Sequence, residues 1–89
     1  HSQWIPGSDP EILMYYFWST LKLANFTILE FIDHRFKPEG YTAIWLLAES
    51  HFALHTFPEH NKTYIELSSC SEEKYDILLK IIRHEYEQN

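Results

Sequence analysis

The order of apolar patterns along the chain is the feature that most restricts its fold. Residues 9–23 are predicted to form a helix, because Asp9 suits its N-cap and Pro10 its first turn. Residues 72–86 are predicted to form a second, amphipathic helix that Ser71 caps. Between the helices lie four segments whose apolar residues alternate or run continuously, as is typical of strands: 27–36, 41–48, 51–56 and 62–69.

A helix, three or four strands and a second helix predict an α+β fold, with both helices on one face of an antiparallel sheet. The segment 41–48 is almost entirely apolar, so we expect a central strand that is buried on both faces. The helix at 9–23 is apolar almost all round and is expected to be covered on more than one side. Residues 1–8, which include a proline and a glycine, are expected to be irregular. With no repeat or linker, residues 1–89 are expected to form a single domain.

The chain carries a large apolar load for its length of 89 residues, because 45% of them are hydrophobic and 17% are aromatic. A domain of this size usually buries only about 60% of the surface of its unfolded chain. The excess therefore indicates either an aromatic-rich core or a surface that is shared with a second copy.

Charge and cysteine content exclude several classes of protein. The net charge of −6 argues against nucleic-acid binding, which needs a basic surface, and favours a cationic or small polar partner. A single cysteine, Cys70, excludes an intrachain disulfide framework. The longest apolar run, residues 12–18, is far shorter than the roughly 20 residues that span a membrane, and no secretion signal is evident. We therefore expect a cytoplasmic location and no membrane partner.

The densest polar cluster lies in residues 49–60, and one interpretation of it is a metal site. His51, His55, His60 and Cys70 are all of types that bind transition metals. However, a spacing of four residues on a strand leaves His51 and His55 about 13 Å apart along the chain. We therefore expect no bound metal.

Two further interpretations of this cluster remain open. Ser50 or Cys70 is a possible nucleophile of a hydrolase with His55 as its base, although no nucleophile-elbow motif surrounds Ser50. Alternatively, these are ordinary residues at strand ends, and Cys70 is a small buried hydrophobic residue. Composition alone favours this last interpretation.

A longer motif points elsewhere. Residues 48–59 resemble the self-processing segment of the bacterial and archaeal S-adenosylmethionine decarboxylases, which typically reads Glu-Ser-His, four residues ending in His, then Thr, an aromatic residue, Pro and Glu. Residues 34–40 resemble the His-x-Phe-x-Pro-x-Gly turn of that family. Thr42 lies eight residues before Ser50, where the family has a hydroxyl residue, and Cys70 follows Ser50 by twenty, as does the family's catalytic cysteine.

The resemblance implies that the chain makes its cofactor from its own backbone. The hydroxyl of Ser50 would attack the carbonyl carbon of Glu49, and the resulting ester would undergo β-elimination and hydrolysis. The products would be a β chain, residues 1–49, and an α chain, residues 50–89, which begins with a pyruvoyl group derived from Ser50. The ketone of that group forms a Schiff base with the substrate amine and accepts the electrons that are released as carbon dioxide leaves.

The resemblance also implies roles for five further residues. His55 would transfer protons during processing, and Thr42 would position the ester. Cys70 would return a proton to the α-carbon of the substrate. Phe36 would stack on the adenine, and Glu59 would bind the ribose hydroxyls.

Members of this family pair their sheets face to face, so we expect a homodimer or a higher oligomer with an α-β-β-α sandwich whose sites draw on both copies. The family also has a strand just before the position of His1, which supplies a second aromatic residue to the adenine site, and another strand after the last helix. Neither strand is evident in this sequence.

The resemblance implies a carboxy-lyase that acts on S-adenosylmethionine and provides the aminopropyl donor for polyamine synthesis, including that of spermidine. One alternative is the same pyruvoyl chemistry on arginine or ornithine. Another is an unprocessed, non-catalytic homologue that acts as a regulatory or dimerisation partner.

Overall fold

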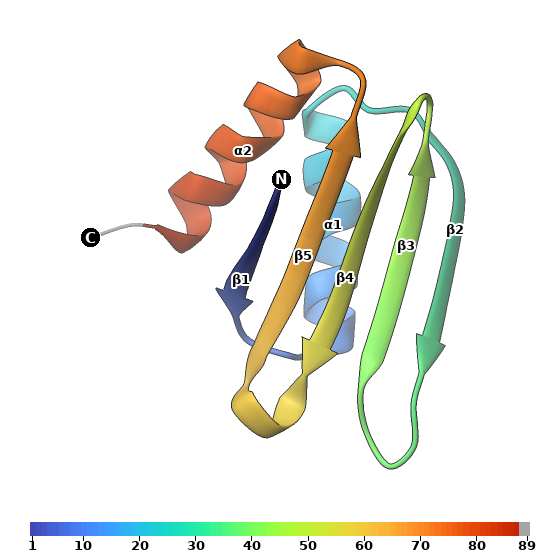
Figure 1. Ribbon diagram of the computed structural model, residues 1–89, viewed down its shortest axis with the longest axis vertical. Coiled ribbons are helices and arrows are strands. Elements are labelled where there is room, and N and C mark those ends of the chain that lie inside the picture. The colour runs from blue at the N-terminus through green and yellow to red at the C-terminus, as the bar shows by residue number, and fades with distance from the viewer. Residues whose placement is uncertain (88–89) are drawn as a thin grey trace.

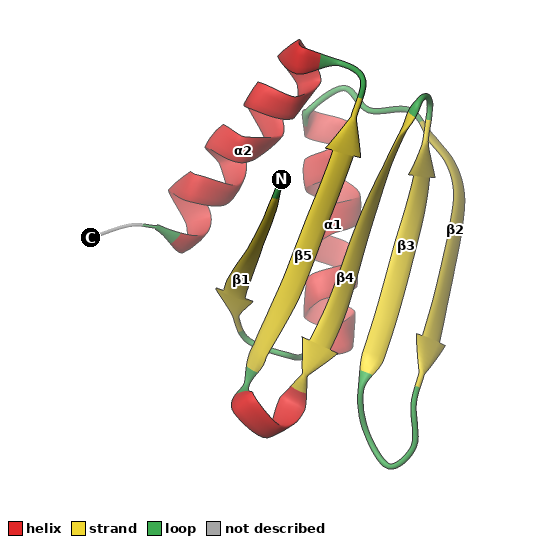
Figure 2. Ribbon diagram, viewed as in Figure 1, coloured by secondary structure: helices red, strands yellow, loops and turns green. Residues whose placement is uncertain are grey.

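The computed structural model describes residues 1–87 and has an α+β fold, in which two helices pack against one face of a five-stranded antiparallel sheet (Figure 1) (Figure 2). This arrangement confirms the predicted fold class. In chain order the elements are β1 (Ser2–Pro6), α1 (Pro10–Leu23), β2 (Ile28–Arg35), β3 (Tyr41–Leu47), β4 (Ser50–Phe57), the 3₁₀ turn η1 (Pro58–His60), β5 (Lys62–Ser69) and α2 (Glu72–Tyr86).

The strands lie in the order β1-β5-β4-β3-β2, and every neighbouring pair is antiparallel. The expectation that residues 1–8 are irregular is wrong, because Ser2–Pro6 forms an edge strand against β5. Pro6 is tolerated there, since an edge strand has backbone positions that donate no ladder hydrogen bond. Immediately after it, the N–H of Gly7 donates to the carbonyl of Asn61 at 2.9 Å and ends the pairing.

Helix α1 begins where the sequence predicts. The carboxylate of Asp9 accepts a hydrogen bond of 3.2 Å from the N–H of Ile12. Only one side of the helix is buried, so the expectation that α1 is covered on more than one side is wrong. Ile12 and Tyr15 are 68% and 67% exposed. The buried side chains of α1 are Leu13, Phe17, Thr20 and Leu21.

Helix α2 has the predicted cap and the predicted apolar stripe. The hydroxyl of Ser71 accepts from the N–H of Lys74 at 3.3 Å. Glu72 and Glu73 occupy the first turn, where negative charge is favourable at the positive end of the helix dipole. The stripe buries Leu78, Leu79 and Ile82.

Strand β3 is buried on one face only, so the expectation of burial on both faces is wrong. Its side chains alternate, and those directed toward the helices are the buried ones: Tyr41, Ala43, Trp45 and Leu47. Ile44 and Leu46 are exposed on the opposite face. The continuous apolar run therefore supplies two surfaces, of which this chain covers one.

Aromatic rings dominate the core between the helices and the sheet. Phe17 of α1 lies against Phe52 of β4 with ring centroids 4.7 Å apart, and Trp45 of β3 lies 5.7 Å from the same ring. These three side chains are completely buried. Tilted pairs of this kind contribute beyond the area that they remove from water.

The sheet face away from the helices is here called the open face. It carries an apolar group of side chains that are exposed in the single chain: Trp4, Ile32, Ile44, Leu46 and Phe57. No element of residues 1–87 covers this face. A contiguous apolar surface on a sheet usually marks an interaction site.

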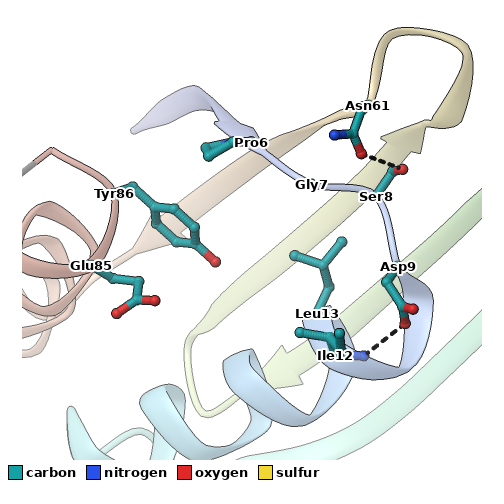
Figure 3. A pocket seen from close by; sticks show the side chains of 9 residues that line it. All are labelled: Pro6, Gly7, Ser8, Asp9, Ile12, Leu13, Asn61, Glu85 and Tyr86. Carbon is teal, nitrogen blue, oxygen red and sulfur yellow. Dashed lines mark hydrogen bonds between the residues drawn. The ribbon is translucent and has the colours of Figure 1, made fainter.

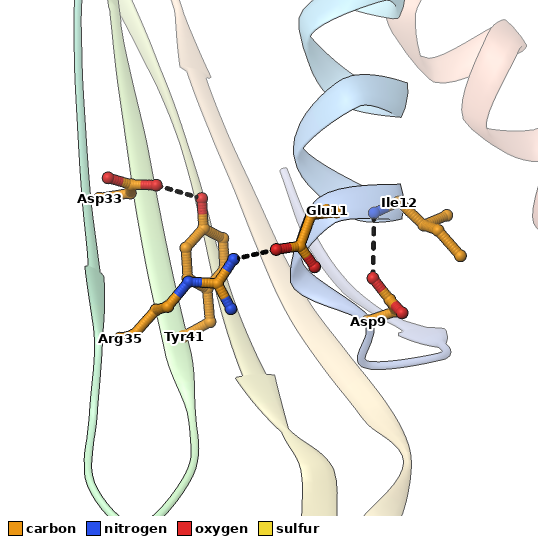
Figure 4. Close-up of polar contacts among 6 residues, drawn as sticks. All are labelled: Asp9, Glu11, Ile12, Asp33, Arg35 and Tyr41. Atoms are coloured by element: carbon orange, nitrogen blue, oxygen red, sulfur yellow. Dashed lines mark hydrogen bonds and ion pairs between the residues drawn. The ribbon is translucent and has the colours of Figure 1, made fainter.

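Polar contacts tie α1 to β2 and β3 at one end of the sheet (Figure 4). Arg35 of β2 forms an ion pair with Glu11 in the first turn of α1, and its guanidinium lies 5.3 Å from the ring centre of Tyr41. The Tyr41 hydroxyl donates to the carboxylate of Asp33 at 2.6 Å. Burial, and secondarily that carboxylate, raises the pKa of Tyr41.

Neither helix in the described part of the chain is long and apolar enough to cross a membrane.

Candidate active site

The β3–β4 hairpin turns through two residues, Ala48 and Glu49, and the flanking Leu47 and Ser50 are paired in register. Glu49 has φ 58°, in the left-handed region that glycine and asparagine tolerate best. The other non-glycine residues with positive φ among the described ones are both asparagine. Placing a side chain such as that of Glu49 in this region costs about 1–2 kcal/mol. The peptide bond between Glu49 and Ser50 therefore directly follows a strained residue of the turn.

The hydroxyl of Ser50 is held by two neighbours in the same chain. It donates to the Oγ of Ser69 at 3.1 Å, and it accepts from the backbone N–H of Cys70 at 3.3 Å. Ser50 and Ser69 are paired across β4 and β5. Sequence reasoning missed Ser69, because its proximity to Ser50 follows from this strand register and not from any local motif.

Cys70 lies between the end of β5 and the cap of α2, and its side chain is exposed. It follows that the structure brings Glu49, Ser50 and Cys70 together at one end of the sheet (Figure 1).

A second group of predicted residues lies on the open face. The Oγ1 of Thr42 and the Nδ1 of His55 are 2.9 Å apart and share a hydrogen bond, with β3 and β4 pairing the two residues directly. His55 is also paired with Tyr64 of β5. These side chains therefore belong to one row that crosses the sheet.

Phe36 and Glu59 lie at the same end of the sheet as Thr42 and His55. Phe36 follows β2, is half exposed, and packs its ring edge-on against that of His34 at 4.6 Å. Together with Pro58 it lines a hollow of about 350 Å³. Glu59 is exposed in η1 and directly follows Pro58, which lines that hollow.

The predicted site residues therefore form two groups at opposite ends of one sheet (Figure 1). Glu49, Ser50 and Cys70 make the first group, and the second consists of Phe36, Thr42, His55 and Glu59. Ser50 and His55 are separated by five residues of β4, which is about 16 Å along a strand. An odd number of residues also directs their side chains to opposite faces. A single chain does not bring Ser50 and His55 together.

Strand β1 adds an aromatic residue, Trp4, that sequence reasoning missed. Trp4 pairs with Tyr64 in the row that contains His55, and its ring lies 5.1 Å from that of Tyr64 and 5.2 Å from that of Phe57. The ammonium group of Lys62 sits 4.1 Å from the centre of the Trp4 ring. Trp4 and Ile5, two residue types that favour strands, were the available signal for this strand, and the proline obscured it.

A larger hollow of about 510 Å³ lies between the β1–α1 connection and the end of α2 (Figure 3). Its polar lining includes Asp9, which caps α1, and Ser8, whose hydroxyl bonds the side chain of Asn61 at 3.2 Å. None of the site residues predicted from the sequence lines it.

Among residues 1–87, no group of three or more His, Cys, Asp or Glu side chains is arranged to hold a metal ion.

The model of one protein family, described as S-adenosylmethionine decarboxylase, matches residues 8–89. The chain belongs to the S-adenosylmethionine decarboxylase family. Its relatives include S-adenosylmethionine decarboxylase proenzymes from Prochlorococcus marinus (strain MIT 9313), 42% identical over 52 residues, and from Pseudomonas paraeruginosa, 37% identical over 70 residues. These alignments cover 58% and 79% of this chain. They cover 42% and 39% of the relatives, so the chain spans about two fifths of the length of the relatives that it matches.

A solved structure has the same fold. The adenosylmethionine decarboxylase from Aquifex aeolicus aligns with a TM-score of 0.76 over 99% of this chain and 78% of its own, at 23% identity. The two chains therefore share one overall fold.

Proposed function

We propose that the chain is a proenzyme that cuts its own backbone between Glu49 and Ser50 and then decarboxylates S-adenosylmethionine. The observation that carries the proposal is the family match over residues 8–89. The relatives are named proenzymes, which supports self-processing. In this proposal the pieces are residues 1–49 and 50–89.

The proposed cofactor is a pyruvoyl group made from Ser50, and the residues present suit its formation. The hydroxyl of Ser50 serves first as nucleophile and then, as the ester oxygen, as leaving group. The strained turn at Glu49 raises the energy of the uncut chain and favours loss of this peptide bond. The pyruvoyl group supplies a carbonyl that takes up electrons as carbon dioxide leaves. Cys70, which follows β5 beside Ser50, is the proposed proton donor to the α-carbon of the substrate.

A second copy of the chain is the proposed partner, and two observations support it. The predicted site residues are divided between the two ends of the sheet, and the open face carries exposed apolar side chains such as Ile44. In such a pair, a two-fold axis would lie between the two open faces and perpendicular to the strands. It would turn one sheet end for end relative to the other. The Ser50 end of one copy would then approach the Thr42 and His55 end of its partner. Such a pair would be an α-β-β-α sandwich.

The substrate's chemistry matches the second group of residues. S-adenosylmethionine carries an adenine, a ribose and a sulfonium cation. Phe36 offers a half-exposed ring for the adenine, and Glu59 offers a carboxylate for the ribose hydroxyls. Trp4 is the proposed second aromatic, since its ring already accepts the ammonium of Lys62 and aromatic faces attract cations. The net charge of −6 also attracts a cationic substrate.

Intact-mass measurement tests the proposal directly. The purified chain is expected as two fragments in place of one species of 10.7 kDa, and the fragment that begins at residue 50 is expected to carry the pyruvoyl group. Ser50→Ala is expected to remain uncut and to release no carbon dioxide. The matched control is Ser19→Ala, which changes an exposed serine of α1 and is expected to be cut normally.

Substrate choice is tested by measuring carbon dioxide release from S-adenosylmethionine, arginine and ornithine side by side. Faster release from arginine or ornithine would show that this amino acid is the substrate, and the proposed pyruvoyl chemistry would still hold. If the wild-type chain stays whole and releases no carbon dioxide, the protein is a non-catalytic homologue.

A further inference from the structure

We propose that Ser69 is a positioning residue for self-cleavage, because its side chain holds the hydroxyl of Ser50 in the orientation from which it attacks. This inference rests on the proposed self-processing at Glu49–Ser50. Its starting point is the register of β4 and β5, which pairs Ser50 with Ser69 and brings their Oγ atoms to 3.1 Å.

Ser69 is itself fixed by the backbone that leads into α2. Its Oγ donates to the carbonyl of Ser71 at 3.2 Å and accepts from the N–H of Ser71 at 3.1 Å. A hydroxyl has one proton and two acceptor positions. With its proton and one acceptor position used by Ser71, Ser69 has one acceptor position left, and the hydroxyl of Ser50 donates to it. Ser69 is therefore an acceptor toward Ser50.

The same count on Ser50 shows what is left for chemistry. Its proton is directed to Ser69, and one acceptor position takes the N–H of Cys70 at 3.3 Å. One lone pair of the Ser50 oxygen stays free to form a bond. His55, in contrast, lies about 16 Å away along β4 and on the other face. Among residues 1–87 of the uncut chain, Ser69 is thus the side chain that is hydrogen-bonded to the nucleophile.

The step that Ser69 assists is balanced within the chain. The Ser50 oxygen bonds to the carbonyl carbon of Glu49, and the bond between that carbon and the Ser50 nitrogen breaks. The proton lost by the hydroxyl ends on the nitrogen, which becomes an amine, so no further reactant is consumed. By accepting a hydrogen bond from the hydroxyl, Ser69 increases electron density on the attacking oxygen and restricts its rotation. Loss of such positioning commonly slows a reaction by about 10- to 100-fold.

The test compares two variants of nearly equal shape. Ser69→Thr keeps the hydroxyl, whereas Ser69→Val removes it, and both β-branched residues suit a strand. Ser19→Val, the same change at an exposed position of α1 and away from the open face, is the control. Cleavage is followed by intact mass from the time of purification, with and without hydroxylamine, which cuts esters and so reports the attack before elimination. Thermal unfolding of each variant reports whether it is folded, and Ser69→Ala replaces Ser69→Val if the latter is not.

The expected result is cleavage about 10- to 100-fold slower in Ser69→Val, with less hydroxylamine-sensitive ester. Ser69→Thr is expected to recover most of the wild-type rate, and Ser19→Val is expected to be cut at the wild-type rate. Wild-type cleavage by Ser69→Val would overturn the role of Ser69 and leave the proposed function intact. Equal slowing by Ser69→Thr and Ser69→Val would also overturn it, since shape alone would then explain the effect. A wild-type chain that is neither cut nor sensitive to hydroxylamine would overturn the proposed function itself and this inference with it.

Discussion

Thr42 and His55 lie directly opposite each other on β3 and β4, with the Thr42 Oγ1 and the His55 Nδ1 2.9 Å apart. Their hydrogen bond lies on the open face, whereas Ser50 bonds Ser69 on the other side of the same strand. About 16 Å of β4 also separates Ser50 from His55 in one chain, so if His55 takes part in processing, it must act on the Ser50 of a second copy.

Mixed dimers test this requirement. A His55→Ala chain alone is expected to process at least 100-fold more slowly, because general acid–base groups contribute about 10²- to 10⁴-fold. When it is co-expressed with a Ser50→Ala chain, its own Glu49–Ser50 bond is expected to be cut, since its partner supplies His55. Mass spectrometry of dimers purified through different tags on the two chains measures this. An uncut His55→Ala chain in mixed dimers would count against the shared site, and a His60→Ala chain serves as the control that is cut on its own.

The open face is expected to hold the dimer together. Ile44→Lys places a charge among exposed apolar side chains at its centre and is expected to give a monomer at micromolar concentration in sedimentation velocity. Ile12→Lys, the same change at an exposed isoleucine of α1, is expected to stay dimeric. Dissociation by Ile12→Lys but not by Ile44→Lys would assign the interface to α1 instead.

Two leucines of very different burial test the core. Leu54 of β4 is completely buried between the sheet and the helices, whereas Leu23 at the end of α1 is 68% exposed. Leu54→Ala is expected to lower the free energy of unfolding by about 2–5 kcal/mol, and Leu23→Ala by about 0.5 kcal/mol or less. Urea unfolding at equal protein concentration measures both. Similar losses in the two variants would contradict the packing described above.

Stability is expected to fall at high pH because of two tyrosines. Burial is the main cause that raises the pKa of Tyr41 and of Tyr86 above the usual value of 10.0. A tyrosine whose pKa is higher in the folded chain contributes stability that is complete below the unfolded pKa and is lost as the pH rises from about 10 toward the folded pKa. Urea unfolding at pH 8 and pH 11 should show the loss. The double variant Tyr41→Phe and Tyr86→Phe should lose less between these two pH values, whereas Tyr15→Phe, at an exposed position, should behave as wild type. An equal loss in the double variant would refute the assignment.

Most helix and strand bounds followed from local signals. Asp9 and Ser71 cap the helices as predicted, because capping depends only on residues three positions apart in the chain. The alternation in Lys62–Ser69 correctly separated buried from exposed side chains, since a strand has a period of two. The errors arose where burial depends on distant elements. The apolar run at Tyr41–Leu47 looked buried on both faces, and α1 looked covered on more than one side.

By itself, the sequence determined the α+β class, the helix caps and the motif around Ser50, because each is encoded by residues close together in the chain. Only the tertiary structure decided that Ser2–Pro6 is a strand, that Ser69 meets Ser50, and that Thr42 lies opposite His55. Those relationships depend on strand order and register. Both are set by packing between segments distant in sequence, and a shift of one residue in register would move every side chain of a strand to its other face.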